Sequence, residues 1–237
     1  LDKGESLELA ARRIRYAFLT SVAEKNNAFG VALGHNKEDV AETVLFNLLR
    51  GAGVRGAAGI PRRRGIFFRP LLGCSRYFLR KILLYREIPW REDCTNADSS
   101  YTRNFIRNEL MPQIERGVNG KAVDHLVAFA EEMRYYREEE ELHGNALFES
   151  AGLKELDVGW AVDRAKLHLL SVEDRAVLIR KIGRHLEIPT LSRERTLELV
   201  RLTEGKGCFE FQWGKQISVS GNRDQVCWIL PIKGVGE

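Results

Sequence analysis

The chain opens with apolar residues at helical spacing. They recur three or four positions apart through residues 5–26, which predicts an amphipathic helix. The apolar run Phe29–Leu33 is too short for a helix and is typical of a buried parallel strand. Asn36 then stands where it can cap a second helix, with Asp39 three residues later in the position of a capping box. The apolar stripe of this second helix begins at Val40.

The pattern continues with a basic, glycine-rich loop and a second short strand. Residues 65–69 predict this strand, which Pro70 stops. Residues 75–87 predict a third helix, and another helical pattern runs from Tyr101 to about Pro112. In the helix at residues 75–87, the side chains that we expect to be buried are Tyr77, Phe78, Ile82, Leu83 and Tyr85.

The second half of the chain predicts a helical region that ends in strands. The segment 117–120 has the glycines of a linker, and the residues after it predict one long helix at 121–150 and shorter helices at 172–187 and 192–203. The acidic run Glu138–Glu141 is typical of a solvated helix face. The predicted strands are Cys208–Trp213, Gln216–Ser220 and Val226–Leu230.

These elements predict two units. Residues 1–112 form an α/β piece, partly Rossmann-like, with a parallel sheet, and residues 113–237 form a mainly helical domain that ends in a small β-hairpin or sheet.

Composition adds few constraints. The net charge of +4 over 237 residues is a weak indication of a polyanionic partner. The four cysteines, Cys74, Cys94, Cys208 and Cys227, form no CxxC pair, so we expect no metal site and reduced thiols in the cytoplasm. There is no signal peptide and no apolar run of roughly 18 residues, so we expect no membrane contact.

Two carboxylates mark the corner between the first strand and the second helix. Asp39 and Glu42 are three residues apart, so they share one helix face, and His35 stands at the end of the strand. Such a pair can hold an ammonium group or Mg²⁺, or can share a proton and act as a base. The alternative is an ordinary helix N-terminus, where acidic residues are common. Spacing alone leaves both interpretations open.

Arginines stand before and after this corner in several groups. Arg12 and Arg15 are three residues apart on the first helix, and Arg103 and Arg107 are four apart on a later one. Guanidinium groups bind phosphate oxygens in a fork, although each of these side chains can also be a solvated surface residue. The arginines of the basic loop and the next strand are Arg50, Arg55, Arg62, Arg63, Arg64 and Arg69.

The motifs together resemble the N-type ATP pyrophosphatase (PP-loop) superfamily and, within it, the tRNA(Ile)-lysidine synthase family. The resemblance is carried by four segments and covers residues 5–112 well and the remainder loosely. The four segments are residues 34–43 (Gly-His-Asn-Lys-Glu-Asp-Val-Ala-Glu-Thr), 50–56 (Arg-Gly-Ala-Gly-Val-Arg-Gly), 69–72 (Arg-Pro-Leu-Leu) and 103–107 (Arg-Asn-Phe-Ile-Arg). Residues 92–96 and 101–102 extend the last segment. The chain departs from the family at Asn36, Glu38 and Val40, where the family often has His, Asp and Gln.

The resemblance implies a set of residue roles. Residues 1–112 would be the C-terminal portion of the catalytic domain, and residues 113–237 a helical tRNA-binding domain. The catalytic residues would be Asp39, Glu42, His35 and Arg107. ATP would be bound by His35, Thr43, Arg15 and Arg103, and the ammonium groups of lysine by Asp39 and Glu42. Transfer RNA would be bound by Arg50, Arg55, Arg62, Arg63 and Arg69.

The resemblance also implies a reaction. ATP, with Mg²⁺, would adenylate C2 of the wobble cytidine in tRNA(Ile) with a CAU anticodon, and lysine would displace AMP to give lysidine. The superfamily turn Ser-Gly-Gly-x-Asp-Ser does not occur in this sequence, so we expect this polypeptide alone to be inactive. A homodimer is a candidate assembly. The alternatives are a tRNA 2-thiolation enzyme, which usually carries CxxC pairs, and a non-catalytic tRNA-binding module.

Overall fold

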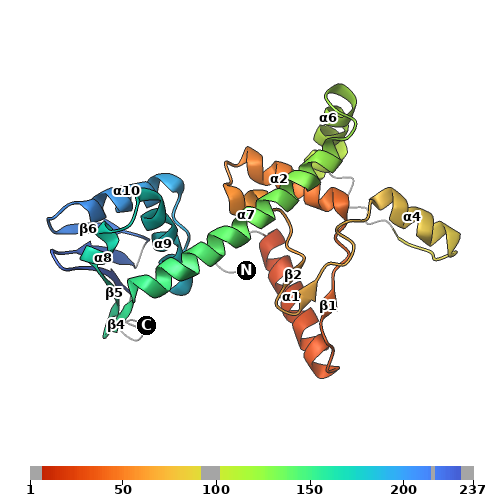
Figure 1. Cartoon of the computed structure of the whole chain (residues 1–237). Helices are drawn as coiled ribbons and strands as arrows, with labels where there is room; N and C mark the ends of the chain where they lie inside the picture. The colour runs from red at the N-terminus through yellow and green to blue at the C-terminus, as the bar shows by residue number, and fades with distance from the viewer. Residues whose placement is uncertain (1–6, 92–101, 215–216, 231–237) are drawn as a thin grey trace. The chain divides into compact units, whose positions relative to one another are not determined.

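The structure is a computed structural model, and it describes residues 7–91, 102–214 and 217–230. The chain forms two compact units, Leu1–Arg137 and Glu138–Glu237 (Figure 1). The motif residues 92–96, with Cys94, lie outside the described residues, as does the start of the predicted strand at Gln216.

The first unit contains short strands and mostly short helices. In chain order these are α1 (Leu7–Lys25), β1 (Val31–Ala32), α2 (Lys37–Leu49), α3 (Val54–Ala57), β2 (Arg63–Arg64), β3 (Phe67–Phe68), α4 (Arg76–Tyr85), α5 (Thr102–Phe105), the π-helix η2 (Ile106–Leu110), α6 (Met111–Gly117) and the first part of α7 (Ala122–Ala151).

The sheet of the first unit has the order β1-β3-β2. Strand β1 pairs with β3 in parallel, with Val31 opposite Phe67, and β2 pairs with β3 antiparallel. Both strands predicted in this half are therefore present, although each has only two residues. The parallel pair needs a crossover between its strands, and α2 and α3 lie in that crossover. This arrangement confirms the α/β fold class.

The core of this unit joins α2 to α7. Val40 and Val44 of α2 are fully buried, and they pack with Ile60, Leu72 and Ala130. Because Ala130 lies on α7, the compact unit extends past residue 112 to Arg137, and the division between the units falls inside one continuous helix. The functional division at 112/113, between a catalytic portion and a tRNA-binding domain, stays a prediction.

Helix α4 differs from the sequence prediction in its burial. The helix is present, and the Oγ atom of Ser75 accepts a hydrogen bond from the backbone N–H of Phe78 at 3.2 Å as its N-cap. However, α4 has no buried residue, and Tyr77 and Tyr85 are 67% and 85% exposed. The prediction that its apolar side chains are buried is therefore wrong for the described chain. Amphipathic spacing predicts a helix but does not identify what covers its apolar face.

The helix predicted to stop near Pro112 continues to Gly117. Its path includes η2, where the backbone N–H of Met111 bonds to the carbonyl of Ile106, five residues earlier. Pro112 has no N–H and sits near the start of α6, a position where a helix tolerates proline. The π-turn therefore lets the helical path pass this proline rather than end at it.

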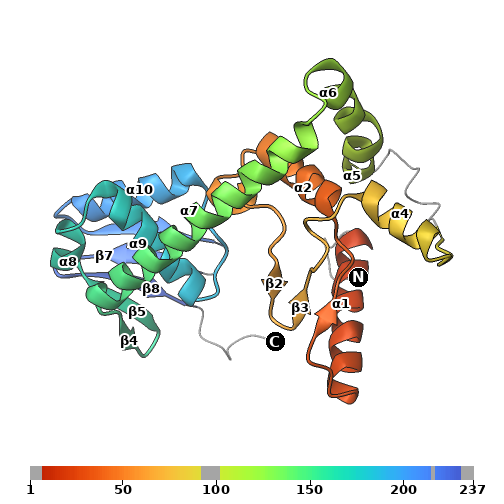
Figure 2. The ribbon, with the colours of Figure 1, turned by 45° about the vertical axis from the view of Figure 1, so that its right-hand side comes forward.

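The second unit packs helices against a five-stranded antiparallel sheet (Figure 2). The sheet order is β4-β5-β8-β7-β6. After the end of α7, its elements are β4 (Lys154–Leu156), β5 (Gly159–Asp163), α8 (Arg164–His168), α9 (Val172–His185), α10 (Arg193–Glu204), β6 (Phe209–Gln212), β7 (Ser218–Gly221) and β8 (Gln225–Ile229). The sequence predicted α9, α10 and the last three strands, but it missed β4, β5 and α8.

Two polar features stabilise the second unit. Arg164 is 1% exposed and donates hydrogen bonds to the carbonyls of Leu202, Thr203, Gly207 and Asn222. The acidic run on α7 is not simply solvated, because Glu140 pairs with Arg180 at 3.7 Å and Glu141 pairs with Lys181 at 2.7 Å. In the described ranges, no helix is long and apolar enough to cross a membrane.

Candidate functional site

The candidate site begins at the corner between β1 and α2. The Oδ1 atom of Asn36 accepts a hydrogen bond from the backbone N–H of Asp39 at 3.0 Å, and the backbone N–H of Asn36 donates to Asp39 Oδ2 at 2.9 Å. This reciprocal capping box is the one that the sequence predicted. The backbone N–H of Lys37 also donates to the carbonyl of Cys74 at 3.0 Å, which ties the corner to the segment before α4. Oδ2 of Asp39 therefore accepts a hydrogen bond within the capping box, and Oδ1 can accept from other groups.

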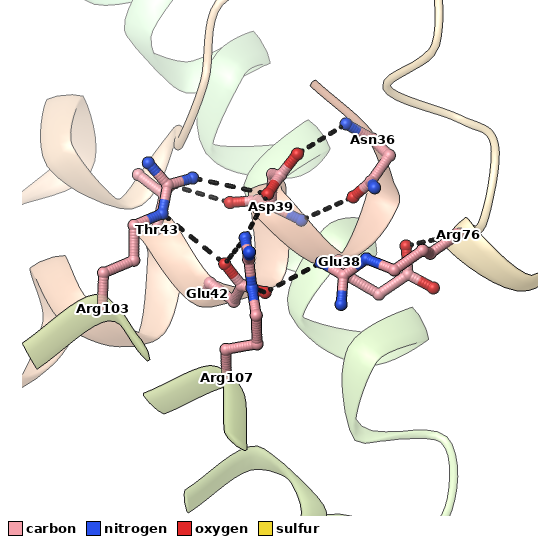
Figure 3. A network of polar contacts seen from close by, with 8 residues as sticks. All are labelled: Asn36, Glu38, Asp39, Glu42, Thr43, Arg76, Arg103 and Arg107. Atoms are coloured by element: carbon pink, nitrogen blue, oxygen red, sulfur yellow. Dashed lines mark hydrogen bonds and ion pairs between the residues drawn. The ribbon is translucent and has the colours of Figure 1, made fainter. Parts of the chain in front are cut away.

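Arg107 of η2 joins the two carboxylates of α2 (Figure 3). Its Nη2 donates to Asp39 Oδ1 and to Glu42 Oε2, both at 2.8 Å, and its Nε donates to Glu42 Oε1 at 2.7 Å. The Glu42 side chain is 3% exposed and that of Asp39 is 13% exposed. A bidentate guanidinium contact of this length is a strong charge-assisted interaction. The predicted pair of carboxylates is therefore present, on one helix face, and is bound to arginine.

Two further arginines complete this acid–arginine cluster, which consists of Asp39, Glu42, Arg76, Arg103 and Arg107. Arg103 lies 3.6 Å from Asp39 Oδ1 and 3.5 Å from Glu42 Oε2, and its side chain is 42% exposed. Arg76 lies 3.3 Å from Glu42 Oε1. The sequence missed Arg76, although the Ser75 cap placed it in the first turn of a helix. Glu38 lies beside the cluster, where its Oε2 accepts a hydrogen bond from the backbone N–H of Arg76 at 2.8 Å, so the three guanidiniums face three carboxylates.

Burial and charge also shift protonation at the site. The hydrogen bond to Glu42 raises the pKa of Arg107 above its usual value. Burial lowers the pKa of His35, and the arginines around it, among them Arg69 and Arg103, add to the shift while Asp39 opposes it. His35 is therefore neutral at physiological pH. Its Nδ1 atom is buried and has no hydrogen-bond partner among the residues that the structure describes.

A cavity of about 270 Å³ adjoins the cluster. Glu42, Arg76 and Arg107 line it together with residues of α2, α6 and α7. The remaining lining residues are Lys37, Glu38, Ser75, Met111, Pro112, Glu115, Val123 and Asp124. Lys37 and Asp124 form an ion pair across it. Space for a small polar molecule thus lies directly beside Glu42 and Arg107.

The predicted ATP-binding residues do not all lie beside the two carboxylates. Thr43 lies on α2, where its hydroxyl donates to the carbonyl of Asp39 at 2.8 Å. This bond places Thr43 one turn along the same helix as Asp39. Arg15 is an exposed residue of α1. The structure therefore brings together His35, Thr43 and Arg103 with the carboxylates, whereas Arg15 is not among the partners of either carboxylate.

The predicted tRNA-binding arginines are spread over the first unit. Arg50 ends α2, with its guanidinium 5.0 Å from the ring centre of Phe46, and Arg55 lies in α3. Arg62 and Arg63 are exposed, but Arg69 is buried, with 6% of its surface accessible.

The described residues do not fit a resident metal ion at this corner. No group of three or more His, Cys, Asp and Glu side chains in the described ranges is arranged to hold a metal. Asp39 Oδ1 and both carboxylate oxygens of Glu42 contact guanidinium groups. A divalent cation would have to displace these arginines to reach the carboxylates.

Comparison with known proteins identifies relatives of the chain. Residues 1–114 match the PP-loop domain family. A tRNA(Ile)-lysidine synthase of Symbiobacterium thermophilum is 34% identical over 251 residues, which cover 98% of this chain and 51% of the relative. That of Chlorobaculum tepidum is 36% identical over 79% of this chain and 56% of the relative, and that of Thermosipho africanus is 48% identical over 45% of this chain and 25% of the relative. The chain thus spans about half or less of the length of these relatives. It carries a PP-loop domain and is a homologue of tRNA(Ile)-lysidine synthases.

Proposed function

We propose that the chain is part of an enzyme that uses ATP to join lysine to C2 of the wobble cytidine in tRNA(Ile) with a CAU anticodon, giving lysidine. The observation that carries this proposal is the acid–arginine cluster. It brings residues of the Asp39–Glu42 segment into contact with Arg103 and Arg107, 61–68 residues further along the chain. Both segments carry the family resemblance. The relatives that match most of this chain are named for the same activity.

Asp39 and Glu42 would seat the ammonium groups of lysine. Their oxygens already accept guanidinium groups, so cations suit this position. Arg107 holds them with three short hydrogen bonds, whereas the contacts of Arg103 are 3.5–3.6 Å long and its side chain is 42% exposed. An arriving ammonium group would therefore displace Arg103 rather than Arg107. The adjoining cavity offers space for the remainder of the amino acid.

Arg103, once displaced, would turn towards the phosphates of ATP. Together with neutral His35, Thr43 and Arg15 it would form the part of the nucleotide site that these residues supply. Donors aimed at the phosphates would stabilise the charge that develops in the transition state. We assign Mg²⁺ to the phosphates of ATP rather than to the carboxylates, because Mg²⁺ binds through substrate phosphates and waters in comparable sites.

The remaining assignments concern the RNA. Adenylation at the C2 oxygen releases pyrophosphate and turns a poor leaving group into AMP, which the amine of lysine then displaces. Arg50, Arg55, Arg62, Arg63 and Arg69 would bind the tRNA backbone. The helical second half would bind tRNA outside the anticodon. The reaction would take place in the cytoplasm, with a homodimer as a candidate assembly.

The test uses the protein at the length that its gene encodes, with ATP, labelled lysine and a tRNA(Ile) transcript bearing CAU. We expect lysine incorporation by the wild type and at least a hundredfold loss with Asp39→Asn, which keeps the shape of the side chain and removes its charge. Glu132→Gln, an exposed acid on α7, is the matched control and should be unaffected.

Other results would contradict the proposal in distinct ways. Sulfur transfer without lysine incorporation would identify a thiolation enzyme. Bound tRNA with neither reaction would identify a binding module. Full lysine incorporation by Asp39→Asn would remove the acid–arginine cluster from the mechanism.

A further inference from the structure

A second cavity lies in the first unit, between the ends of β2 and β3 and helix α7. Its volume is about 220 Å³. Three arginines from separate parts of the chain line it: Arg62 just before β2, Arg69 just after β3, and Arg134 on α7. The other lining residues are Pro70, Leu72, Gly73, Val127 and Glu131. The two strand-end arginines are held beside each other, because the backbone N–H of Arg69 donates to the carbonyl of Arg62 at 2.9 Å.

The cavity has an excess of positive charge. Glu131 is the one carboxylate among its lining residues, and it lies 3.4 Å from Arg62 and 3.8 Å from Arg134. The Glu131 side chain is 54% exposed, so water screens its charge. Three guanidiniums against one carboxylate leave a net charge of +2. Arg134 is fixed in place, because its Nε donates to the carbonyl of Ala58 at 3.2 Å.

Arg69 is buried without a counter-charge. It is 6% exposed, its Nη1 donates to the carbonyl of Pro61 at 2.9 Å, and its Nη2 donates to the hydroxyl of Tyr16 at 3.4 Å. Its Nε atom has no hydrogen-bond partner, and no carboxylate pairs with it in the described part of the chain. A buried charge is costly unless it is paired, and an unsatisfied buried donor adds to that cost. An anion in this cavity would supply the missing counter-charge.

We infer that this cavity binds a phosphate group of the tRNA backbone, with Arg134 as a contact that the sequence patterns did not indicate. This inference rests on the proposed function. Arginine forks match phosphate oxygens, and a phosphodiester fits within the volume of the cavity. Among the residues that the structure describes, no aromatic side chain lines this cavity, so these residues provide no stacking surface for a base. A backbone phosphate, rather than a whole nucleotide, is therefore its ligand.

The first experiment measures tRNA(Ile) affinity against salt concentration for the gene-length protein. Each phosphate contact contributes about 0.7–0.9 to the slope of log affinity against log salt. We expect Arg134→Gln to lower the slope by about that amount and to weaken binding about tenfold at physiological salt. Arg62→Gln should do the same, and its side chain is 76% exposed, so this change does not threaten folding. Arg137→Gln, three residues further along the same helix and outside the cavity lining, is the control and should change neither quantity.

A second experiment separates a backbone phosphate from a free one. Inorganic phosphate is titrated against thermal unfolding and against bound tRNA, at constant ionic strength. If the cavity serves the RNA backbone, phosphate should displace tRNA only weakly while the two cavity variants still lower the salt slope. If phosphate raises the melting temperature of the wild type alone and the slopes are equal, the cavity holds a free anion and the inference is wrong.

The two proposals can fail separately. Lysine incorporation by the wild type with equal salt slopes for all variants would overturn the phosphate cavity and leave the proposed function intact. Lowered slopes without lysine incorporation would support the cavity and overturn the reaction. A wild type that binds no tRNA would overturn both.

Discussion

Removing Arg107 tests how the acid–arginine cluster is stabilised. Arg107→Met takes away three hydrogen bonds of 2.7–2.8 Å from Asp39 and Glu42. Within the described part of the chain, Glu42, with its side chain 3% exposed, then keeps the longer contacts to Arg76 at 3.3 Å and to Arg103 at 3.5 Å. Breaking a buried ion pair from one side costs about 3–5 kcal/mol. Because two guanidiniums remain, we expect a loss of about 2–4 kcal/mol in the free energy of unfolding of the first unit.

Comparison of Arg107→Lys with Arg107→Met separates the contribution of charge to the free energy of unfolding from that of hydrogen-bond geometry. Lysine keeps the positive charge but cannot form the bidentate fork, so we expect a loss of about 1–2 kcal/mol. Amide hydrogen exchange of the α2 backbone at fixed pH reports the local free energy of opening, whether or not the two units unfold together. Arg116→Met on α6 is the control, with an expected change within about 0.5 kcal/mol, because Arg116 is exposed. A loss below about 1 kcal/mol for Arg107→Met would show that Arg107 does not compensate the buried charge of Glu42.

Three further predictions follow from polar groups described above. The pKa of His35 is lower in the fold than in the unfolded chain, so the contribution of neutral His35 to stability is complete above about pH 6.5 and is lost as pH falls towards the folded pKa. As the pH is lowered from 8 to 5, the melting temperature should therefore fall more steeply for the wild type than for His35→Gln. Arg164→Met leaves buried carbonyls at the end of α10 unpaired, so urea unfolding should show a loss of about 3–5 kcal/mol in the free energy of unfolding of the second unit. Arg201→Met, a change at an exposed residue of the same helix, is the control and should cause little loss. Asn36→Ala removes the bond to the N–H of Asp39 and should cost about 1 kcal/mol by the same measurement on the first unit.

Local interactions were predictable from the sequence. The N-terminus of α2 depends on residues three positions apart, so Asn36 and Asp39 identified the capping box before the structure did. The common face of Asp39 and Glu42 follows from helix geometry in the same way. The resemblance to a family placed Arg103 and Arg107 at the same active site as this corner, but it suggested phosphate rather than carboxylate as their partner.

Long-range partners were not predictable. Arg76 joins Glu42 from another helix, 34 residues away, and no local pattern signals that contact. Strand β4 has only exposed side chains and no alternation of apolar and polar residues, so periodicity could not reveal it. The exposed apolar face of α4 shows the converse case, since a strong helical pattern predicted burial that the described chain does not provide.

The capping box and the acid–arginine cluster also separate two stages in the folding of the first unit. The contact between Asn36 and Asp39 spans three residues, so α2 can acquire its cap as soon as its first turn forms. The contacts of Glu42 to Arg76 and Arg107 span 34 and 65 residues, and they need two long loops to close first. A cap present in the transition state affects the folding rate, whereas contacts that form after it affect the unfolding rate. Loss of the Asn36 side chain should therefore slow refolding, and loss of the Arg107 side chain should mainly shorten the lifetime of the native state. The arginine contacts of the site that we propose for catalysis are thus among the last parts of the unit to assemble and the first to come apart.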